Sequence, residues 1–336
     1  KVCLNKIYMF HGKKILFFSA NFFGYQNEIA AKLNFLGAEV KSYDERPKNT
    51  FFYKAMIRLD KRLLKKKLEK YYGEIIDDNS KIELDFIFFL KAEAITEDKL
   101  KELKESQPNA KLILYMWDSI ENCPSVQKLF PLFDTIKSFD PVDVKENEHL
   151  TFRPLFYLDD YRRLNQSRNL MYDITFIGTG HTDRYEIVSK FKKLCDEKNL
   201  KYYFFIYLQD LKIFYARKMF SKAFRFAKKD DFSFKPLLKE DILKIIEKSK
   251  CVLDIERPVQ RGLTMRTIEI LGARKKLITT NKDIVNYDFY NSTNILVIDR
   301  EDPKITLDFI EGTYIDIPVE TYQKYSINYW IHEVFN

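Results

Sequence analysis

The residues from Gln260 to Asn281, QRGLTMRTIEILGARKKLITTN, combine residue types that can bind a phosphorylated ligand. Gly262 opens a run with helical periodicity, and a helix N-terminus that follows a glycine offers backbone N–H groups to an anion. Three arginines, whose guanidinium groups match phosphate oxygens, occur close together: Arg257, Arg261 and Arg266. This pattern predicts an anion site suited to a diphosphate.

Glu269 lies two turns into the expected helix, among apolar neighbours. A carboxylate can accept two hydrogen bonds at once, which suits the two hydroxyl groups of a ribose. Two structural alternatives remain open: a salt bridge with Arg266, or a place on an exposed face of the helix. Gly272 is expected to end this helix.

A second glycine-rich turn, FIGTGHTDRYEIV (176–188), joins an expected strand to an expected helix. A GxG pattern alone is common in turns. Here it follows the first strand of a sheet, and open α/β sheets bind ligands at the carboxyl ends of their strands. Gly178 and Arg184 are therefore predicted to contact the diphosphate, and His181 the phosphate, base or sugar. For His181 the alternative is an exposed turn.

Two strand ends in the first half of the chain carry polar candidates. Asn21 and Gly24 stand between an expected strand and an expected helix, again at the carboxyl end of the strand. Asp118 follows an apolar strand and can act as a general base toward an acceptor hydroxyl. The alternative for Asp118 is an N-cap of the next helix.

These candidates need strands and helices to position them. From Lys13 onward, apolar β-like runs alternate with amphipathic helical runs. Such alternation predicts an α/β protein whose parallel sheets are covered by helices on both faces. The first half has expected strands at 15–19, 39–43, 86–90, 111–117, 135–139 and 151–157. The alternation stops in a polar segment and then restarts, which predicts two tandem Rossmann-like, doubly wound domains with a ligand-binding cleft between them.

The expected domain bounds follow from this reading. An N-terminal domain is expected at 1–157, a linker at 158–173 and a C-terminal domain at 174–317. The aromatic-rich segment 318–336 is expected to form a C-terminal helix. That helix either crosses back to the first domain or caps its own.

The composition is that of a globular protein, with 46% hydrophobic and 32% charged residues among 336. No apolar run reaches the roughly 20 residues of a transmembrane helix, and the start of the sequence lacks the features of a signal peptide. A cytoplasmic protein is therefore expected. The four cysteines lack the spacing of metal ligands, so no metal site is expected.

The net charge of +8 is concentrated in two segments, 54–70 and 211–229. In 54–70, apolar residues recur at helical spacing and are expected to face a core. In 211–229, aromatic residues alternate with seven Lys or Arg and no acid, which suits the anionic surface of a membrane and a peripheral location at its inner face. Single-stranded nucleic acid also favours such a surface. No nucleic-acid motif accompanies the segment, so no nucleic-acid partner is expected.

The region from Leu237 to Pro303 resembles the nucleotide-sugar half of GT-B glycosyltransferases, particularly the bacterial surface-polysaccharide and CgeB-like enzymes of the group 1 type. It carries PLLKEDILKIIEKSKCVLDIE, then GLTMRTIEILGARKKLITTN, then NILVID, in the family's order. The resemblance implies that Glu269 holds the ribose. It also implies that the backbone of Gly262, Leu263 and Thr264 faces the diphosphate, and that no metal or cofactor is needed beside the nucleotide-sugar donor.

The sequence departs from the family at Arg261, where many retaining members have a glutamate eight positions before the second one. Asp254 and Glu256 can replace that acid as acceptors for sugar hydroxyls, or form a salt bridge with Arg257. The resemblance implies a hexosyltransferase that uses a glycan or lipid-linked acceptor, as in lipopolysaccharide synthesis. It also implies that Asn21 and Gly24 lie on the acceptor side. The alternatives are a nucleotide-sugar epimerase of the same fold, or a non-catalytic protein that binds nucleotides or nucleic acid.

Overall fold

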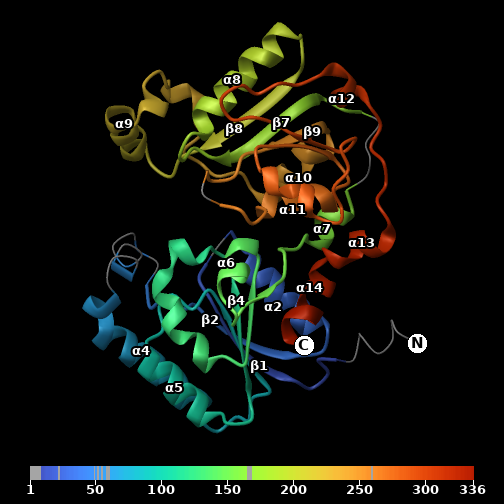
Figure 1. The fold of residues 1–336 in the computed structure, drawn as a ribbon. Coiled ribbons are helices and arrows are strands. Elements are labelled where there is room, and N and C mark those ends of the chain that lie inside the picture. Colours follow the sequence, from blue (N-terminus) through green and yellow to red (C-terminus); the bar gives the residue numbers. More distant parts are fainter. Residues whose placement is uncertain are drawn as a thin grey trace. The chain divides into compact units, whose positions relative to one another are not determined.

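The computed structural model describes residues 9–336 except for 22, 49, 51–52, 54–55, 58–60, 165–168 and 259. The chain divides into two compact units (Figure 1). Unit 1 consists of Lys1–Leu155 with Ile327–Asn336, and unit 2 of Phe156–Ser326. Each unit has its own parallel sheet, which confirms the predicted α/β class with two sheets.

The sheet of unit 1 has six parallel strands in the order β2-β1-β3-β4-β5-β6. The strands are β1 (Lys14–Ser19), β2 (Glu39–Tyr43), β3 (Phe86–Leu90), β4 (Lys111–Met116), β5 (Thr135–Ser138) and β6 (Thr151–Phe152). The central strands β1, β3 and β4 are apolar almost throughout, because they are buried on both faces.

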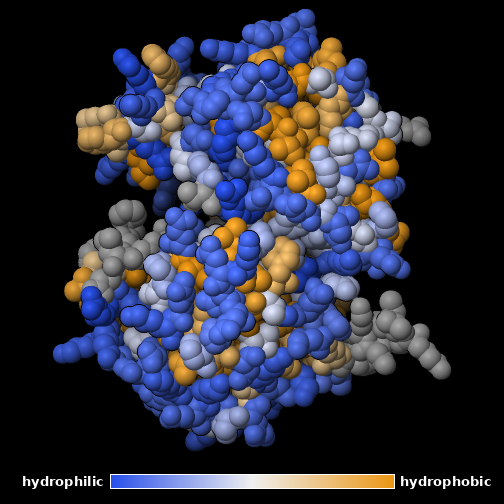
Figure 2. Space-filling view, viewed as in Figure 1, coloured by the Kyte–Doolittle hydropathy of each residue, from blue (hydrophilic) through white to orange (hydrophobic). Residues whose placement is uncertain are grey.

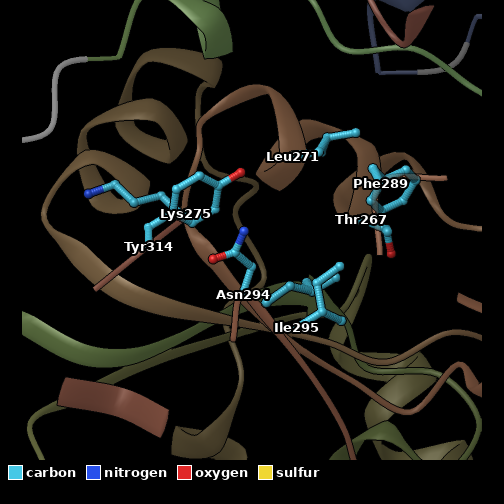
Figure 3. Close-up of a pocket in the computed structure, with 8 residues that line it drawn as sticks. Thr267, Leu271, Lys275, Phe289, Asn294, Ile295 and Tyr314 are labelled. Atoms are coloured by element: carbon cyan, nitrogen blue, oxygen red, sulfur yellow. The ribbon is translucent and has the colours of Figure 1, made fainter. Parts of the chain in front are cut away.

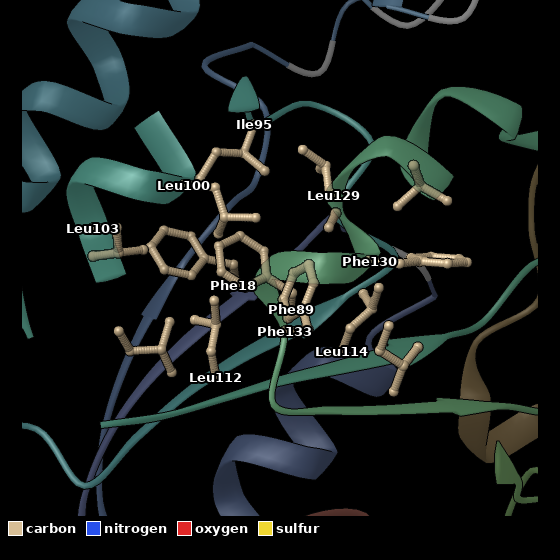
Figure 4. Packing of buried hydrophobic residues seen from close by; sticks show 14 of the residues in the cluster. Phe18, Phe89, Ile95, Leu100, Leu103, Leu112, Leu114, Leu129, Phe130 and Phe133 are labelled. Atoms are coloured by element: carbon tan, nitrogen blue, oxygen red, sulfur yellow. The ribbon is translucent and has the colours of Figure 1, made fainter. Parts of the chain in front are cut away.

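One face of this sheet is covered by α4 (Lys65–Asn79), α5 (Glu97–Ser106) and the 3-10 helix η3 (Pro124–Leu132). Side chains alternate between the two faces of a strand, so Phe18 and Phe89 point to the same side. Their rings stack with centroids 4.4 Å apart. Figure 4 shows these rings among leucines from the covering helices.

The opposite face of the unit 1 sheet carries α2 (Tyr25–Phe35) and α14 (Ile327–Phe335). Trp330 of α14 is fully buried, and its ring centroid lies 4.7 Å from that of Tyr115. Phe335 lies 5.1 Å from Phe88 in the same way. The remaining short helices of unit 1 are η1 (Lys61–Leu64), η2 (Ile120–Asn122) and α6 (Pro141–Glu146).

The sheet of unit 2 has five parallel strands in the order β11-β10-β9-β7-β8. The strands are β7 (Tyr172–Thr179), β8 (Tyr202–Tyr207), β9 (Ser249–Asp254), β10 (Lys276–Thr279) and β11 (Ile295–Val297). The helices are α7 (Asp159–Arg162), α8 (Arg184–Glu197), α9 (Leu211–Phe220), α10 (Lys239–Glu247), α11 (Met265–Gly272), α12 (Leu307–Glu311) and α13 (Val319–Lys324). Short 3-10 helices occur at η4 (Lys222–Phe224), η5 (Lys229–Asp231) and η6 (Lys282–Asn286).

Two segments have more structure than the sequence suggested. Within 158–173, the described residues include α7, whose Tyr161 is buried, and the first residues of β7. Within 318–336 there are two helices: α13 lies in unit 2 and α14 in unit 1.

Two further expectations concern the basic segment 54–70 and the membrane. The described apolar residues of 54–70 include Ile57, Leu64 and Leu68, which are buried, and Leu63, which is exposed. Leu59 lies outside the described residues. No helix in the described part of the chain combines the length and apolar character that crossing a membrane requires.

Candidate functional site

The carboxyl ends of β7, β9 and β10 lie at one edge of the unit 2 sheet, because the strands are adjacent and parallel. Polar turns follow all three strands, and α8 and α11 begin in the turns after β7 and β9. Strand ends and helix N-termini of this kind form the ligand-binding edge of open α/β sheets.

Asp254, the last residue of β9, fixes the start of α11. Its carboxylate accepts hydrogen bonds from Thr264 Oγ1 at 2.5 Å and Thr267 Oγ1 at 2.6 Å. Thr264 is also the N-cap, and its hydroxyl oxygen accepts from the backbone N–H of Thr267 at 3.1 Å. Gly262 and Leu263, which precede the cap, are buried. The loop predicted to face a diphosphate is therefore held at the strand end by side-chain hydrogen bonds.

Glu256 lies two residues beyond β9 in a buried ion-pair network. Its carboxylate accepts from Arg300 Nη2 and from Thr280 Oγ1, both at 2.5 Å. Arg300 Nη1 lies 2.7 Å from Asp183 Oδ2, in the residue before α8. Burial raises the pKa of Glu256, against the opposing effect of the bonds from Thr280 and Arg300. The network ties the end of β9 to the start of α8.

Three basic side chains converge near the turn after β7. Arg184 Nε donates to the backbone oxygen of Ile255 at 2.6 Å. Arg217, which comes from α9, donates from Nη1 to the backbone oxygen of Gly180 at 2.5 Å. His181 lies in the turn itself, three residues before Arg184, and is half-buried.

The pKa values of these three groups are lowered, mainly by burial. Burial and the neighbouring Arg184, Arg257 and Arg217 lower the pKa of His181 to about 3, so its ring is neutral at pH 7. Burial lowers the pKa of Arg217. Burial, together with two neighbouring arginines, lowers the pKa of Arg184 despite two nearby acids. A bound anion would raise all three pKa values and be stabilised in return.

Glu269 is held in an ion pair on the side of α11 that faces α7. It is 2% exposed, and its Oε2 lies 2.8 Å from Arg266 Nη1. Burial and the charge of Glu269 raise the pKa of Tyr161, a residue of α7. The salt bridge with Arg266 that the sequence left open is therefore present. Ribose binding by Glu269 stays a prediction.

The carboxyl edge of the unit 1 sheet holds a second group of charged residues. Glu45 and Arg46 follow β2, Lys91 and Glu93 follow β3, and Asp118 follows β4. Glu45, Arg46 and Glu93 are buried, with exposed fractions of 0, 7 and 2%. Burying three charged side chains is costly unless they are paired.

The charges of this group are joined in a chain of ion pairs. Arg46 Nε donates to Glu93 Oε1 at 2.7 Å. Lys91 Nζ lies 2.8 Å from Glu93 Oε2 and 3.1 Å from Asp118 Oδ2. Lys91 and Ala92 have φ values of +86° and +53°, in the left-handed region that residues other than glycine rarely adopt. Backbone strain of this kind is concentrated at functional sites.

Glu45 and Glu93 differ in their protonation at neutral pH. Glu45 Oε2 accepts from the backbone N–H of Glu93 at 3.1 Å, so the two residues are in contact. Burial, followed by repulsion from Glu93, raises the pKa of Glu45 to about 8. The ion pairs with Lys91 and Arg46 lower the pKa of Glu93, despite its burial. Glu45 is therefore mainly protonated at pH 7 and Glu93 is charged.

Asp118 is more accessible than Glu45 and Glu93, with a side chain 31% exposed. Its Oδ1 accepts from Asn122 Nδ2 at 2.8 Å, and the N-cap of the next helix, η2, is Ser119. Asp118 is therefore not the N-cap. On the same edge, Asn21 accepts a hydrogen bond from the side chain of Gln26 at 3.0 Å. Gly24, with φ +82°, begins α2 in a conformation that favours glycine.

Solved structures match the chain over nearly its whole length at low sequence identity. OtsA in its apo form has a TM-score of 0.63 with 10% identity, covering 97% of this chain and 99% of its own. Alr3699/HepE from Anabaena, in complex with UDP and glucose, has a TM-score of 0.58 with 11% identity, covering 96% and 99%. A glycosyltransferase from Rickettsia africae has a TM-score of 0.55 with 11% identity, covering 97% of both chains.

The fold is GT-B-like. A UDP-GlcNAc 2-epimerase from Methanocaldococcus jannaschii is also similar, with a TM-score of 0.51 and 8% identity over 96% of this chain and 99% of its own. At these identities the likeness shows the fold alone. The sequence matches no protein-family model and no curated protein.

On the GT-B frame, the residues predicted for the donor fall into separate groups. His181, Arg184 and Glu256 lie around the ends of β7 and β9, whereas Arg266 and Glu269 pair with each other. Arg261 is exposed and lies 3.6 Å from Asp283. Gly178 has a structural reason to be glycine. A Cβ there would lie 2.7 Å from the ring of Phe176.

The sequence did not identify four charged residues that lie near the carboxyl edges of the two sheets: Arg217, Arg300, Glu45 and Glu93. Arg217 was included in the basic segment 211–229, which was predicted to face a membrane surface. Its place three residues after Phe214, which is buried, is the signal that puts it on the inner face of α9. The other three follow strands in turns of mixed polarity, and nothing in the sequence shows that such charges are buried.

A small cavity lies between α11 and the strands β10 and β11 (Figure 3). It is lined by Thr267, Leu271, Lys275, Leu277, Phe289, Asn294, Ile295 and Tyr314. Its volume is about 10 Å³, which suits one water molecule rather than a nucleotide. The described residues contain no cluster of His, Cys, Asp or Glu that could hold a metal ion.

Proposed function

We propose that the chain is a glycosyltransferase. It would move a hexose from a nucleotide-diphosphate sugar to a glycan or lipid-linked acceptor of a bacterial surface polysaccharide such as lipopolysaccharide. The observation that carries the proposal is the convergence of Arg184 and Arg217 on the turn between β7 and the start of α8. A diphosphate has the negative charge and the hydrogen-bond acceptors that arginines and a helix N-terminus bind. The GT-B-like fold, shared with a structure that holds UDP and glucose, supports the proposal.

In this proposal unit 2 binds the donor. The N-terminus of α8 and the arginines around it take the diphosphate, together with the backbone of 262–264 before α11. Arg261 and Arg266, which flank residues 262–264 in the sequence, add positive charge there. Glu256, His181 and Glu269 bind hydroxyl groups of the sugar and the ribose. The nucleotide sugar is a co-substrate, and no further cofactor takes part.

The transfer forms one bond and breaks another. The acceptor hydroxyl oxygen bonds to the anomeric carbon, and the bond from that carbon to the diphosphate oxygen breaks, its electron pair leaving with the diphosphate. The arginines stabilise the negative charge that develops there, so the proposal requires no metal ion. Asp118 takes the hydroxyl proton as general base. Lys91 positions Asp118, and Asn21 and Gly24 lie on the acceptor side.

Binding of a donor should be visible as a rise in thermal stability, because a ligand that binds only the folded state stabilises it by mass action. The experiment is a thermal unfolding assay with UDP-, GDP-, ADP-, TDP- and CMP-linked sugars. A ligand at 100 times its Kd adds about 2.7 kcal/mol to the free energy of unfolding. Arg217→Gln should reduce the rise, and Lys212→Gln, which removes a charge from the exposed face of the same helix, should leave it unchanged.

The outcomes separate the candidate functions. No stabilisation by any of these sugars would contradict the transferase proposal. Stabilisation followed by conversion of the donor to an isomer of equal mass, with no acceptor present, would indicate an epimerase of the same fold. Release of nucleoside diphosphate that speeds up when a glycan acceptor is added is the result expected for the transferase.

A further inference from the structure

Large apolar side chains project into solvent from α9 and the turn that follows it. Met219, Phe220 and Phe226 are 72, 80 and 82% exposed, and Tyr215 is 57% exposed. We call these four residues the α9 patch. Figure 2 shows apolar side chains at the surface over α9, with hydrophilic residues around them. Soluble proteins seldom expose several large apolar side chains together unless the surface meets a partner.

The α9 patch does not belong to the hydrophobic core of unit 2. The inner face of the same segment is already packed: Phe214 and Phe224 are 2 and 1% exposed. The rings of both lie 5.5 Å from the ring of Phe232. The core of unit 2 therefore closes without the α9 patch.

Basic residues surround the α9 patch and no acidic residue lies within 211–229. The exposed basic residues are Lys212, Lys218, Lys222, Arg225, Lys228 and Lys229. Arg225 lies over the ring of Phe226, with its guanidinium carbon 5.5 Å from the ring centroid. Apolar side chains inside a ring of positive charge match the boundary of a membrane, where acyl chains meet anionic headgroups.

We infer that the α9 patch docks on a membrane surface that contains anionic lipid. A lipid surface fits better than nucleic acid. Met219 has no ring on which a base can stack, whereas a flexible apolar side chain and the phenyl rings of Phe220 and Phe226 all suit acyl chains. Charge complementarity selects the anionic leaflet, and the apolar side chains supply the part of the binding that salt does not screen.

The docking surface and the proposed donor edge share one helix. Arg217 of α9 donates to the backbone oxygen of Gly180 in the turn after β7. Helix α9 therefore connects the α9 patch on its outer face to the turn of the proposed donor edge. A link to a lipid-linked acceptor rests on the proposed function. The docking itself does not, and it can be measured with neither donor nor acceptor present.

The test is flotation of the protein with vesicles of phosphatidylcholine alone, or with about one third phosphatidylglycerol, at low and high salt. We expect binding to the anionic vesicles and its weakening at high salt. Replacing Phe220 and Phe226 together by Ser should abolish the part that remains at high salt. Lys222→Glu with Arg225→Glu should lower the partition coefficient at least about fivefold per basic residue lost.

The control is Phe35→Ser in unit 1. Phe35 is 81% exposed, and Lys32 Nζ lies 5.1 Å from its ring centroid. It is therefore an exposed phenylalanine beside a basic residue, like Phe226, but it lies outside the α9 patch. This variant should bind vesicles like the unchanged protein. Circular dichroism and thermal unfolding establish that each variant is folded.

Three results would overturn the inference. These are equal binding to vesicles with and without phosphatidylglycerol, no binding to either, or a loss of binding in Phe35→Ser as large as that in the double variant of Phe220 and Phe226. Patch-dependent binding of a single-stranded oligonucleotide without vesicle binding would assign the surface to nucleic acid instead. Absence of transferase activity would leave the vesicle result unaffected.

Discussion

At the scale of single residues, Glu45 shows how strongly the interior changes a side chain. It is fully buried, contacts the backbone of Glu93 and keeps its proton at neutral pH, while Glu93 is charged through its pairs with Lys91 and Arg46. The same arrangement holds Lys91 against Asp118. Protonation of Glu45 therefore allows the remaining charges of this edge to be paired.

The raised pKa of Glu45 predicts how stability depends on pH. With a folded pKa of about 8 and an ordinary value of 4.5, Glu45 binds a proton in the folded protein that the unfolded chain releases between these pH values. The free energy of unfolding should therefore fall as pH rises through this window. The folded pKa of Glu93 is lowered, so Glu93 makes the free energy of unfolding rise with pH, and only below its ordinary pKa of 4.5.

Glu45→Gln should remove this dependence. Denaturant unfolding from pH 5 to pH 8, with hydrogen exchange to assign the transition to unit 1, measures it. The exposed Glu105→Gln serves as the control and should behave like the unchanged protein. An unaltered pH slope in Glu45→Gln would show that Glu45 is charged when buried.

Ribose binding by Glu269 can be separated from its ion pair with Arg266. Glu269→Gln should weaken binding of UDP by about 1.5 to 3 kcal/mol, the range for a hydrogen bond to a charged group. Binding of inorganic pyrophosphate, which has no ribose, should not change. Isothermal titration with both ligands makes the comparison, and an equal loss for the two would mean that Glu269 acts only by supporting α11.

At the scale of elements, α11 is placed by contacts at both ends. Asp254 binds the two threonines at its start. At its last residue, Gly272, an added Cβ would lie 2.5 Å from the ring of Tyr157. The sequence reading of Gly272 as a helix terminator was incomplete, because the C-cap is Ala273 and glycine is needed for this close approach.

Two glycine substitutions should have opposite effects. Gly272→Ala should lower the free energy of unfolding by about 1 to 3 kcal/mol, since it forces a methyl group against Tyr157. Gly73→Ala, inside α4, should raise it by about 0.5 to 1 kcal/mol, because alanine favours a helix and the added Cβ meets only the flexible end of Lys99. Chemical denaturation of both variants tests this. A loss of stability in both would point to the helices rather than to the contact with Tyr157.

The elements could largely be predicted from the sequence, whereas the charged sites could not. Apolar runs such as 86–90 and 111–116 show β-structure directly, because a strand buried on both faces needs no polar residue. Helix α7 was missed since its one buried residue, Tyr161, gives no periodicity in a four-residue helix. Asp118 and Arg184 were found from their places after strands. Their partners Lys91 and Ile255 depend on which strands are neighbours, and a single sequence does not give that order.

At the scale of the whole molecule, the unit 1 core depends on residues from both parts of the sequence. Trp330 of α14 is 0% exposed and contacts Tyr115 of β4, more than two hundred residues earlier. Trp330→Ala should therefore destabilise unit 1 by about 3 to 5 kcal/mol. Hydrogen exchange should show faster exchange in β3 and β4, with β7 and β9 unchanged. The exposed Asn328→Ala in the same helix is the control, and faster exchange confined to α14 would contradict the prediction.

The position of α14 also sets the order in which the protein can mature during synthesis. Unit 1 is interrupted in the sequence by the whole of unit 2, from Phe156 to Ser326. A nascent chain therefore exposes the apolar face of Phe88 and Tyr115 until Ile327–Phe335 has left the ribosome, whereas unit 2 is complete before that point. The domain that begins first is the one that finishes last, and in the interval its open sheet is a surface for chaperones.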